Sequence, residues 1–550
     1  MILESLRKSL ASRTEDWAKG LGATVPEKLA LAAPPPHVKA EVSLAWPMVL
    51  AKILRRNPLE AAKDLAASFS DIPEIESAQA EPPGFVNITL KLSALCANLK
   101  AVTLAPQDYG RDPDAAPRRI LMEFVSANPT GPLHLASGRG ATLGDSLARI
   151  LRRIGHDVWA EYYVNDAGAR VTLLGLSLKA RYDELHGRPA QVPEGGYQGD
   201  YLKDLAAALP EKAGNWSADE FGRWAMDTLL ASHKKDMDDF RVQFNRWFKE
   251  SELHASGAVE ETLKYLKDRG MVYEKESALW LGTSSDEKAG DDKDRVLVRS
   301  DGRPTYFLPD IAYHKTKYDR GFAELIDIFG ADHHGYVPRL KAAISALGHD
   351  PNSCHAIVHQ LIHLYRGQEA VKMSKRAGTF VPLREVMEEA GTDACRFFFA
   401  LRTPDSHLNF DLDLAKKQSS ENPVYYCQYV HARICSIFRE AAKQNILPAG
   451  SPLPEPNASL LGVPEERALM AKIAWFPAAL KSCEKELSPH PLASYVLELA
   501  GVFHSFYEKC RVNDAANPEL SRARLLLCAG ARDVMAQGLG LLGVSAPQKM

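Results

Sequence analysis

Arg119-Ile-Leu-Met-Glu-Phe-Val-Ser-Ala-Asn-Pro-Thr-Gly-Pro-Leu-His134-Leu-Ala-Ser-Gly-Arg-Gly140 is the stretch of sequence that decides the fold. Its first seven residues form an apolar run typical of a buried strand, and a Gly/Pro-rich turn follows them. After the turn, apolar residues recur at helical spacing and stop before Gly155: Leu143, Leu147, Ile150, Leu151 and Ile154. We therefore expect a buried strand, a turn and an amphipathic helix in this order.

A second strand is predicted from Val158 to Val164. Strand, turn, helix and strand make a βαβ unit, which is right-handed almost without exception. The ligand crevice of such a unit lies at the carboxyl end of the first strand, where the helix N-terminus attracts phosphate. The chain contains neither a P-loop motif nor an intact Gly-x-Gly-x-x-Gly, so the crevice is predicted to belong to neither of those classes.

Far downstream, Val371-Lys-Met-Ser-Lys-Arg376 places two lysines three residues apart around a serine. Ammonium groups at this spacing suit a triphosphate whose charge is redistributed as pyrophosphate leaves. The alternative is that these lysines lie in a solvated basic turn with no ligand. The upstream βαβ unit favours the interpretation that they bind phosphate.

With both segments considered together, the chain resembles a class I aminoacyl-tRNA synthetase, and within that class the bacterial type of arginyl-tRNA synthetase. The resemblance covers nearly the whole chain. It implies ATP-dependent ligation of L-arginine to tRNA-Arg through an arginyl-adenylate. Further matching stretches follow in the family's order, at residues 161–168, 330–340, 392–399, 405–413, 421–426 and 538–547.

We predict a multidomain α/β protein. Residues 1–110 are expected to form a small α+β N-terminal domain that contacts tRNA. Residues 111–392 are expected to form a Rossmann-like catalytic domain with a parallel sheet and a helical insertion near 180–255. Residues 393–550 are expected to form an all-α bundle that binds the anticodon.

The resemblance also implies roles for single residues around ATP. Lys375 would bind the departing pyrophosphate with help from Lys372 and the Ser374 hydroxyl, and His134 would donate to a phosphate oxygen. Ser137 completes the predicted catalytic set of His134, Ser137, Lys372 and Lys375. Ala136 and His333 are expected to contact ATP as well.

Recognition of arginine requires acceptors for a planar, always-charged fork of five donors. The family's pattern assigns Glu123, Ser126 and Asn128 to substrate binding, with Glu123 and Asn128 at the α-amino end. It assigns Tyr306 and Asp310 as well, with Asp310 as the carboxylate for the guanidinium. An alternative is that Asp310 caps a helix that begins at Ile311.

No metal held by protein ligands is expected. His355, His359 and His363 would align on a helix, but this segment is predicted to be a strand, where residues four apart lie ~13 Å from each other. The eight cysteines include no Cys-x-x-Cys pair, which argues against a zinc site. Magnesium is expected to arrive with ATP, held largely by phosphates and water.

The motif at the start of the predicted helix, His134-Leu-Ala-Ser137, departs from the family pattern. Members of the family normally have His-x-Gly-His at this position. Loss of a preorganised donor costs on the order of 10²–10³ in rate. Compensation by Arg139 or the helix amides is one interpretation. A catalytically weak or inactive paralogue that binds tRNA or arginine is another, and a slow or engineered variant is a third. The intact lysine loop, Tyr306 and Asp310 favour a working enzyme.

Bulk properties are those of an ordinary globular protein, with 45% hydrophobic and 25% charged residues. The formal net charge of −3 does not favour nucleic-acid binding, and the family resemblance outweighs it. No apolar run approaches the ~20 residues of a membrane span, and no signal peptide is recognised. We expect a cytoplasmic monomer whose partners are tRNA-Arg, L-arginine and ATP, with no membrane association.

Overall fold

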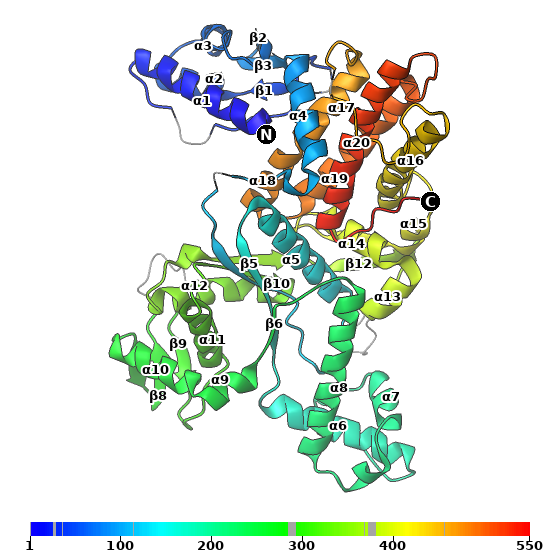
Figure 1. The fold of residues 1–550 in the computed structure, drawn as a ribbon. Helices are drawn as coiled ribbons and strands as arrows, with labels where there is room; N and C mark the ends of the chain where they lie inside the picture. The colour runs from blue at the N-terminus through cyan, green and yellow to red at the C-terminus, as the bar shows by residue number, and fades with distance from the viewer. Residues whose placement is uncertain are drawn as a thin grey trace.

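The structure is a computed structural model that describes all residues except 1, 26–28, 36, 114, 284–292, 368, 372–380 and 456. Figure 1 shows three stacked parts: an N-terminal sheet beside a helical bundle, a central parallel sheet, and two lobes beyond that sheet. The predicted fold class is confirmed. The lysine loop, with Lys372, Ser374 and Lys375, lies outside the described residues.

The N-terminal part is a three-stranded antiparallel sheet with helices. Its strands pair in the order β1-β3-β2, and β3 shows the predicted alternation because Val86, Ile88 and Leu90 are buried while the residues between them are not. The elements are α1 (Ile2–Gly20), β1 (Val42–Leu44), α2 (Trp46–Leu54), α3 (Pro58–Ala67), β2 (Ile75–Glu81), β3 (Phe85–Leu90) and α4 (Leu92–Leu104), with η1 (Pro106–Asp108) leading out.

The central sheet has five parallel strands in the order β11-β10-β4-β5-β6. They are β4 (Arg119–Glu123), β5 (Asp157–Val164), β6 (Arg246–Lys249), β10 (Glu324–Gly330) and β11 (Cys354–His359). Helix α5 (Leu135–Ile154) crosses from β4 to β5, as predicted. It packs so closely that a methyl group on Gly144 would lie 2.2 Å from Phe124 Cγ, so glycine is required there.

Helices α6 (Ala169–Leu185), α7 (Tyr201–Ala207) and α8 (Ala218–Asp239), with η2 (Glu211–Asn215), form the lower right lobe of Figure 1. Ser217 caps α8 with Glu220 in a reciprocal capping box. Gly175 of α6 lies against the α8 backbone, because an added Cβ would be 1.8 Å from the Ala218 oxygen. The lobe is therefore joined by a close helix crossing.

The other lobe carries the residues that face the central sheet. Helix α11 (Phe307–Asp319) packs next to α10 (Ala258–Asp268) and α12 (Val337–Ala346). The remaining elements are α9 (Glu250–Ser256), the antiparallel sheet β7 (Val272–Lys275), β8 (Ala278–Leu281) and β9 (Arg295–Val298), η3 (Ala331–Tyr336) and η4 (Pro351–Ser353).

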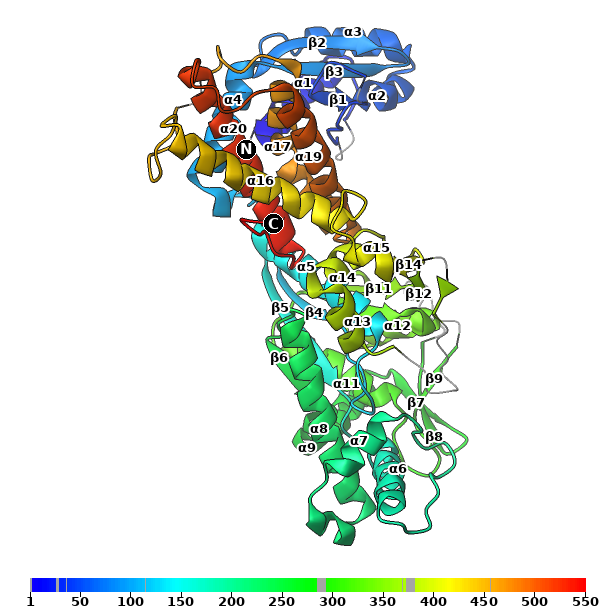
Figure 2. The same cartoon turned by 90° about the vertical axis from the view of Figure 1, so that its right-hand side faces the viewer.

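After the central sheet the chain turns into the helical bundle, shown from the side in Figure 2. The leading elements are β12 (Ile362–Arg366), β13 (Glu369–Ala370), α13 (Leu383–Ala390), α14 (Thr392–Ala400), β14 (Leu408–Asp411) and α15 (Leu412–Lys416). The bundle itself consists of α16 (Pro423–Lys443), α17 (Pro464–Ala474), α18 (Phe476–Glu486), α19 (His490–Lys509) and α20 (Pro518–Leu541).

The prediction of an all-helical region from residue 393 was wrong at β14, which pairs in parallel with β12 through Leu408 and Phe410. This four-residue strand buries both side chains between the sheet and the helices around it. The apolar stripe of α19 is core, as predicted, with Leu492, Leu499 and Phe506 fully buried. No helix among the described residues is long and apolar enough to cross a bilayer.

Buried polar contacts join these parts. Arg396 of α14 donates to the Asp145 carboxylate of α5, and its Nε lies 2.8 Å from the Leu542 oxygen at the end of α20. At the other end of the bundle, Arg467 pairs with Glu41 beside β1. The Arg396 guanidinium is fully buried and bonds both to α5 and to the backbone directly after α20, so one paired cation joins these two helices.

Candidate active site

The turn after β4 is strained at two consecutive residues. Val125 and Ser126 have φ values of 69° and 40°, a region that β-branched residues rarely adopt. The Ser126 hydroxyl holds this turn, because it donates to Glu123 Oε1 at 2.9 Å and accepts from the Tyr163 amide at 3.1 Å. The turn thereby brings Ser126 and the half-buried Asn128 to the carboxyl edge of the sheet.

His134, Ala136 and Ser137 lie together in the first turn of α5. His134 occupies the N-cap position in extended conformation, and Ser137 is only 7% exposed. The strand-like bridge between His134 and Pro382 and the 2.8 Å hydrogen bond from the Leu383 amide to the Leu133 oxygen fasten the chain beyond residue 380 to this turn. The described chain that follows the predicted lysine loop therefore begins beside His134.

Arg139 does not serve as the compensating donor that the sequence suggested. Its guanidinium donates to the backbone oxygens of Gln360, Thr403 and Ser406 at 2.8–2.9 Å. Burial lowers its pKa to about 10. Both terminal nitrogens of Arg139 are bonded to these three oxygens, so Arg139 links the loop at Gln360 to the loop at 403–406 and does not face a ligand.

His333 lies in η3, directly after β10, at the same edge of the sheet. Its side chain is exposed and its ring stacks on Phe329 with centroids 5.5 Å apart. His359, at the end of β11, was not predicted at the site and packs against Gly140. Burial and the Arg139 cation lower the pKa of His359 to about 4, so this imidazole is neutral at physiological pH.

The strand prediction for the three spaced histidines holds for β11 and β12, with a break at residues 360–361. His355 lies 3.3 Å from Glu324, and His363 is exposed on β12 with its ring 5.7 Å from that of His407. The histidines thus lie in different surroundings rather than on one helix face.

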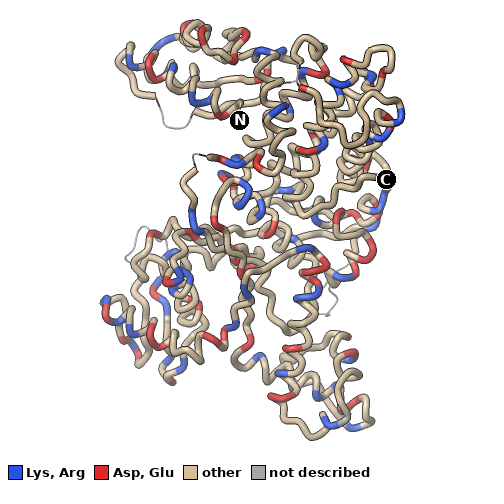
Figure 3. The backbone as a smooth tube through the Cα atoms, viewed as in Figure 1, with Lys and Arg blue, Asp and Glu red and all other residues tan. Residues whose placement is uncertain are grey.

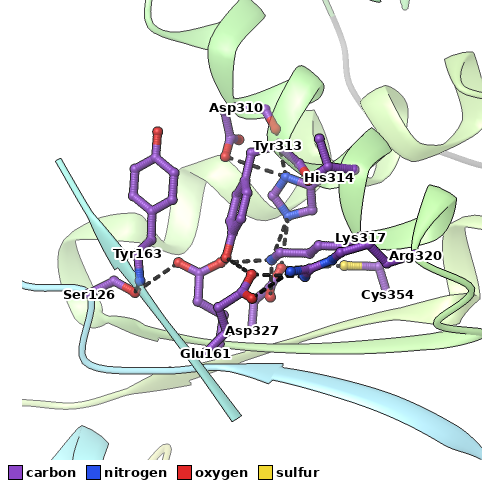
Figure 4. A network of polar contacts seen from close by, with 12 residues as sticks. Ser126, Glu161, Tyr163, Asp310, Tyr313, His314, Lys317, Arg320, Asp327 and Cys354 are labelled. Carbon is purple, nitrogen blue, oxygen red and sulfur yellow. Dashed lines mark hydrogen bonds and ion pairs between the residues drawn. The ribbon is translucent and has the colours of Figure 1, made fainter. Parts of the chain in front are cut away.

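Three acidic residues occupy one register row across the sheet, and their cations come from helix α11 and from Arg320 directly after it. Glu123 of β4 is in register with Asp327 of β10 and with Glu161 of β5. Lys317 Nζ lies 2.7 Å from Glu123 and 2.9 Å from Asp327, while Arg320 holds Glu161 with bonds of 2.7 and 2.9 Å. Figure 4 shows part of this network.

These charges fix one another's protonation. Burial alone would raise the pKa of Asp327, but the Lys317 and His314 cations lower it well below its usual range. Burial and Lys317 would lower the pKa of His314, but the carboxylates of Asp310 and Asp327 raise it to about 10. His314 is therefore cationic at neutral pH, and its Nε2 donates to Asp327 at 3.0 Å.

Asp310 lies inside the first turn of α11, which begins at Phe307 and not at Ile311. The interpretation of Asp310 as a helix cap is therefore wrong. Its carboxylate accepts from the Tyr336 hydroxyl and lies 3.4 Å from His314 Nδ1, and its side chain is 28% exposed. Burial would raise the pKa of Asp310, but the His314 cation lowers it, so the group is ionised.

Tyr306, directly before α11, is 71% exposed. The cations of α11 were missed from the sequence, although their spacing was visible. Asp310, His314 and Lys317 follow one another at intervals of four and three residues, which places them on one helix face.

His314, Asp327 and Cys354 bring potential metal-ligand atoms within 4.8 Å of one another. The Lys317 ammonium, 2.9 Å from Asp327, already supplies the positive charge that a metal ion would bring to this cluster. Magnesium prefers oxygen ligands, whereas the residues at the His134 edge offer mainly nitrogen donors. This donor set suits a magnesium ion that is held by nucleotide phosphates and water.

Three family models match the chain in sequence order. They are the arginyl-tRNA synthetase N-terminal domain at residues 2–90, the class I (R) tRNA synthetase catalytic domain at 103–399, and the DALR anticodon-binding domain at 427–550.

Curated relatives match over all or nearly all of their length. The chain is 49% identical over 554 residues to the arginine–tRNA ligase of Elusimicrobium minutum, covering 100% of both chains. It is 45% identical to that of Carboxydothermus hydrogenoformans, covering 95% of both. Among solved structures, arginyl-tRNA synthetase from Thermus thermophilus superimposes with a TM-score of 0.78 at 23% identity, covering 99% of this chain and 100% of that one, which supports the fold.

Proposed function

This chain belongs to the arginyl-tRNA synthetase family, and on that premise we propose that it ligates L-arginine to tRNA-Arg with ATP through an arginyl-adenylate. The arginine carboxylate attacks the α-phosphate, pyrophosphate leaves, and the arginyl group then passes to the terminal adenosine of tRNA. The observation that carries the proposal is the match of all three family models in sequence order, at residues 2–90, 103–399 and 427–550.

At the ATP end, the protein mainly positions groups and stabilises developing charge. His134 and the amides of the first α5 turn donate to phosphate oxygens, Ala136 lies under the adenine, and His333 closes the other side. Lys372, Ser374 and Lys375 hold the pyrophosphate. The bridge between His134 and Pro382 supports this assignment, because the described chain that follows the lysine loop begins beside the same turn. Magnesium, bound to the phosphates, supplies further charge neutralisation.

At the arginine end, the ionised Asp310 takes the guanidinium and Tyr306 closes over the substrate. Ser126 and Asn128 face the α-amino end. Glu123 contributes there through its Oε1 edge, because Oε2 is occupied by Lys317. Rejection of lysine follows, since a carboxylate arranged for a fork and left half-paired is costly.

The tRNA is bound by the first and last parts of the chain, with residues 1–110 at its body and the bundle from residue 393 at its anticodon. Figure 3 shows Lys and Arg interspersed with Asp and Glu throughout, consistent with the net charge of −3. Shape and local contacts must therefore contribute more than a uniform basic surface would. The protein works as a cytoplasmic monomer.

Charging of a tRNA-Arg transcript with labelled arginine and ATP tests the proposal, beside a His134→Ala/Lys375→Ala control. Charging well above the control supports the ligase and shows that the altered motif at His134 is tolerated. Retained tRNA binding without charging would contradict it and restore the inactive paralogue, which none of the full-length relatives described above favours.

A further inference from the structure

Tyr336 reaches the candidate guanidinium carboxylate from a segment for which no such role was predicted. It closes η3, the short helix that also carries His333, and its hydroxyl donates to Asp310 Oδ2. The donor comes from η3, which follows β10, and the acceptor lies 26 residues earlier in α11. The contact therefore ties the His333 segment to the arginine end of the site.

The Tyr336 ring is held by its neighbours. Ring centroids of Phe307, Phe329 and His333 lie 6.3, 6.4 and 6.4 Å from its own, and all three contacts are edge-to-face. Phe307 comes from the start of α11 and Phe329 from the end of β10. Because the ring is enclosed on these sides, the position of its hydroxyl is set by the packing of two elements.

Asp310 then has one protein partner on each oxygen. Oδ2 accepts from Tyr336, and Oδ1 lies 3.4 Å from His314 Nδ1. A carboxylate offers about four acceptor positions, so about two remain for a ligand. With 28% of the side chain exposed, these positions can present both oxygens to an incoming planar fork.

We propose that Tyr336 is a specificity-determining positioning residue, whose hydroxyl fixes the plane of the Asp310 carboxylate for bidentate binding of the arginine guanidinium. The proposal rests on the proposed function. A guanidinium presents two parallel N–H groups in a rigid plane and therefore needs an oriented acceptor. The lysine ammonium is a compact charge that needs none, so loss of orientation weakens arginine selectively.

Tyr336→Phe removes only the hydroxyl, and Tyr318→Phe is its matched control. Tyr318 lies on α11 and pairs its hydroxyl with Ser353 at 2.8 Å. We expect Tyr336→Phe to raise the arginine KM about tenfold, since it removes one hydrogen bond to a charged group. Turnover, the ATP KM and the inhibition constant of lysine should stay within about twofold, and Tyr318→Phe should match the wild type in all four.

An unchanged arginine KM in Tyr336→Phe overturns the positioning role. Equal weakening of arginine and lysine overturns it too, because Tyr336 would then shape the cavity without orienting the carboxylate. A wild-type protein that fails to charge contradicts the proposed function instead. In that case the arginine Kd of wild type and Tyr336→Phe, measured by calorimetry, decides the positioning role on its own.

Discussion

The ammonium of Lys317 lies 2.7 Å from the Glu123 carboxylate, although 194 residues separate the two in the sequence. The same ammonium lies 2.9 Å from Asp327, the register neighbour of Glu123 on β10. One helix thus neutralises two adjacent strands beneath the candidate site. The strand turn that carries Ser126 and Asn128 depends on this pairing, because Ser126 donates to the same Glu123 carboxylate.

Lys317→Met should destabilise the protein by about 3–5 kcal/mol, because it leaves buried Glu123 and Asp327 without their cation. Urea unfolding measures the change. Lys315→Met is the matched control, since Lys315 pairs with an exposed Asp319 and should change stability by less than about 1 kcal/mol. Equal effects of the two substitutions would contradict the importance of the buried row.

His314 should make stability fall as the pH rises through the alkaline range. Its pKa is raised to about 10 in the folded protein, from an ordinary value of 6.5. The group binds its proton more tightly when folded, so its contribution is complete below pH 6.5 and is lost as the pH rises through about 10. The groups that face it are Asp310, Asp327 and Lys317.

His314→Gln removes this contribution, so wild type and variant should differ most at pH 6 and converge toward pH 10. Urea unfolding at pH 6, 8 and 10 measures the difference. A gap that stays constant over this range would mean that His314 contributes through packing and not through its charge.

Gly144→Ala should destabilise the protein by about 3 kcal/mol, because the new methyl group would lie 2.2 Å from Phe124 Cγ and separate α5 from β4. Gly540→Ala is the control within helix α20, where no atom lies within 4 Å, and it should gain up to about 1 kcal/mol from helix propensity. Thermal and urea unfolding of both variants should show that the free energy of unfolding falls for Gly144→Ala and rises for Gly540→Ala.

His134→Ala should lower the charging rate by about 10²–10³-fold, as expected for loss of a preorganised donor to a developing charge. Ser137→Ala should cost about tenfold if its neutral hydroxyl donates in the transition state. Single-turnover charging at saturating arginine and ATP measures both. A Ser137→Ala rate equal to that of the wild type would assign the missing donor to the α5 amides.

Much of the fold could be predicted because its signals are local. The apolar run at Arg119, the spacing from Leu143 to Ile154 and the glycine at 155 each act within a few residues, and β4, α5 and β5 lie where they were expected. The alternative interpretation of Asp310 as a cap placed the start of α11 at Ile311, four residues late, because Pro309 is tolerated in a first helical turn and gives no boundary signal there.

The charge row could not be predicted. Which carboxylate receives Lys317 depends on how α11 lies over β4 and β10, and no local pattern records that register. The same holds for Arg139, whose role as a link between two loops depends on the carbonyls of three loop residues. Residue types suggested the chemistry of the site, whereas their partners were settled by long-range packing.

The buried contacts of Arg396 with Asp145 and with the Leu542 oxygen have a consequence for folding during synthesis. Asp145 precedes Arg396 by 251 residues, and Arg396 in turn precedes the Leu542 oxygen by 146. A nascent chain on the ribosome can form strand β4 and helix α5 early. The Asp145 carboxylate of α5 has no cation until Arg396 is synthesised, and Arg396 lacks its carbonyl partner until Leu542 is synthesised. Helix α5 can therefore make all of these contacts only after nearly the whole chain has emerged. A chain that terminates inside α20 would lack the Leu542 oxygen that holds Arg396 against α5.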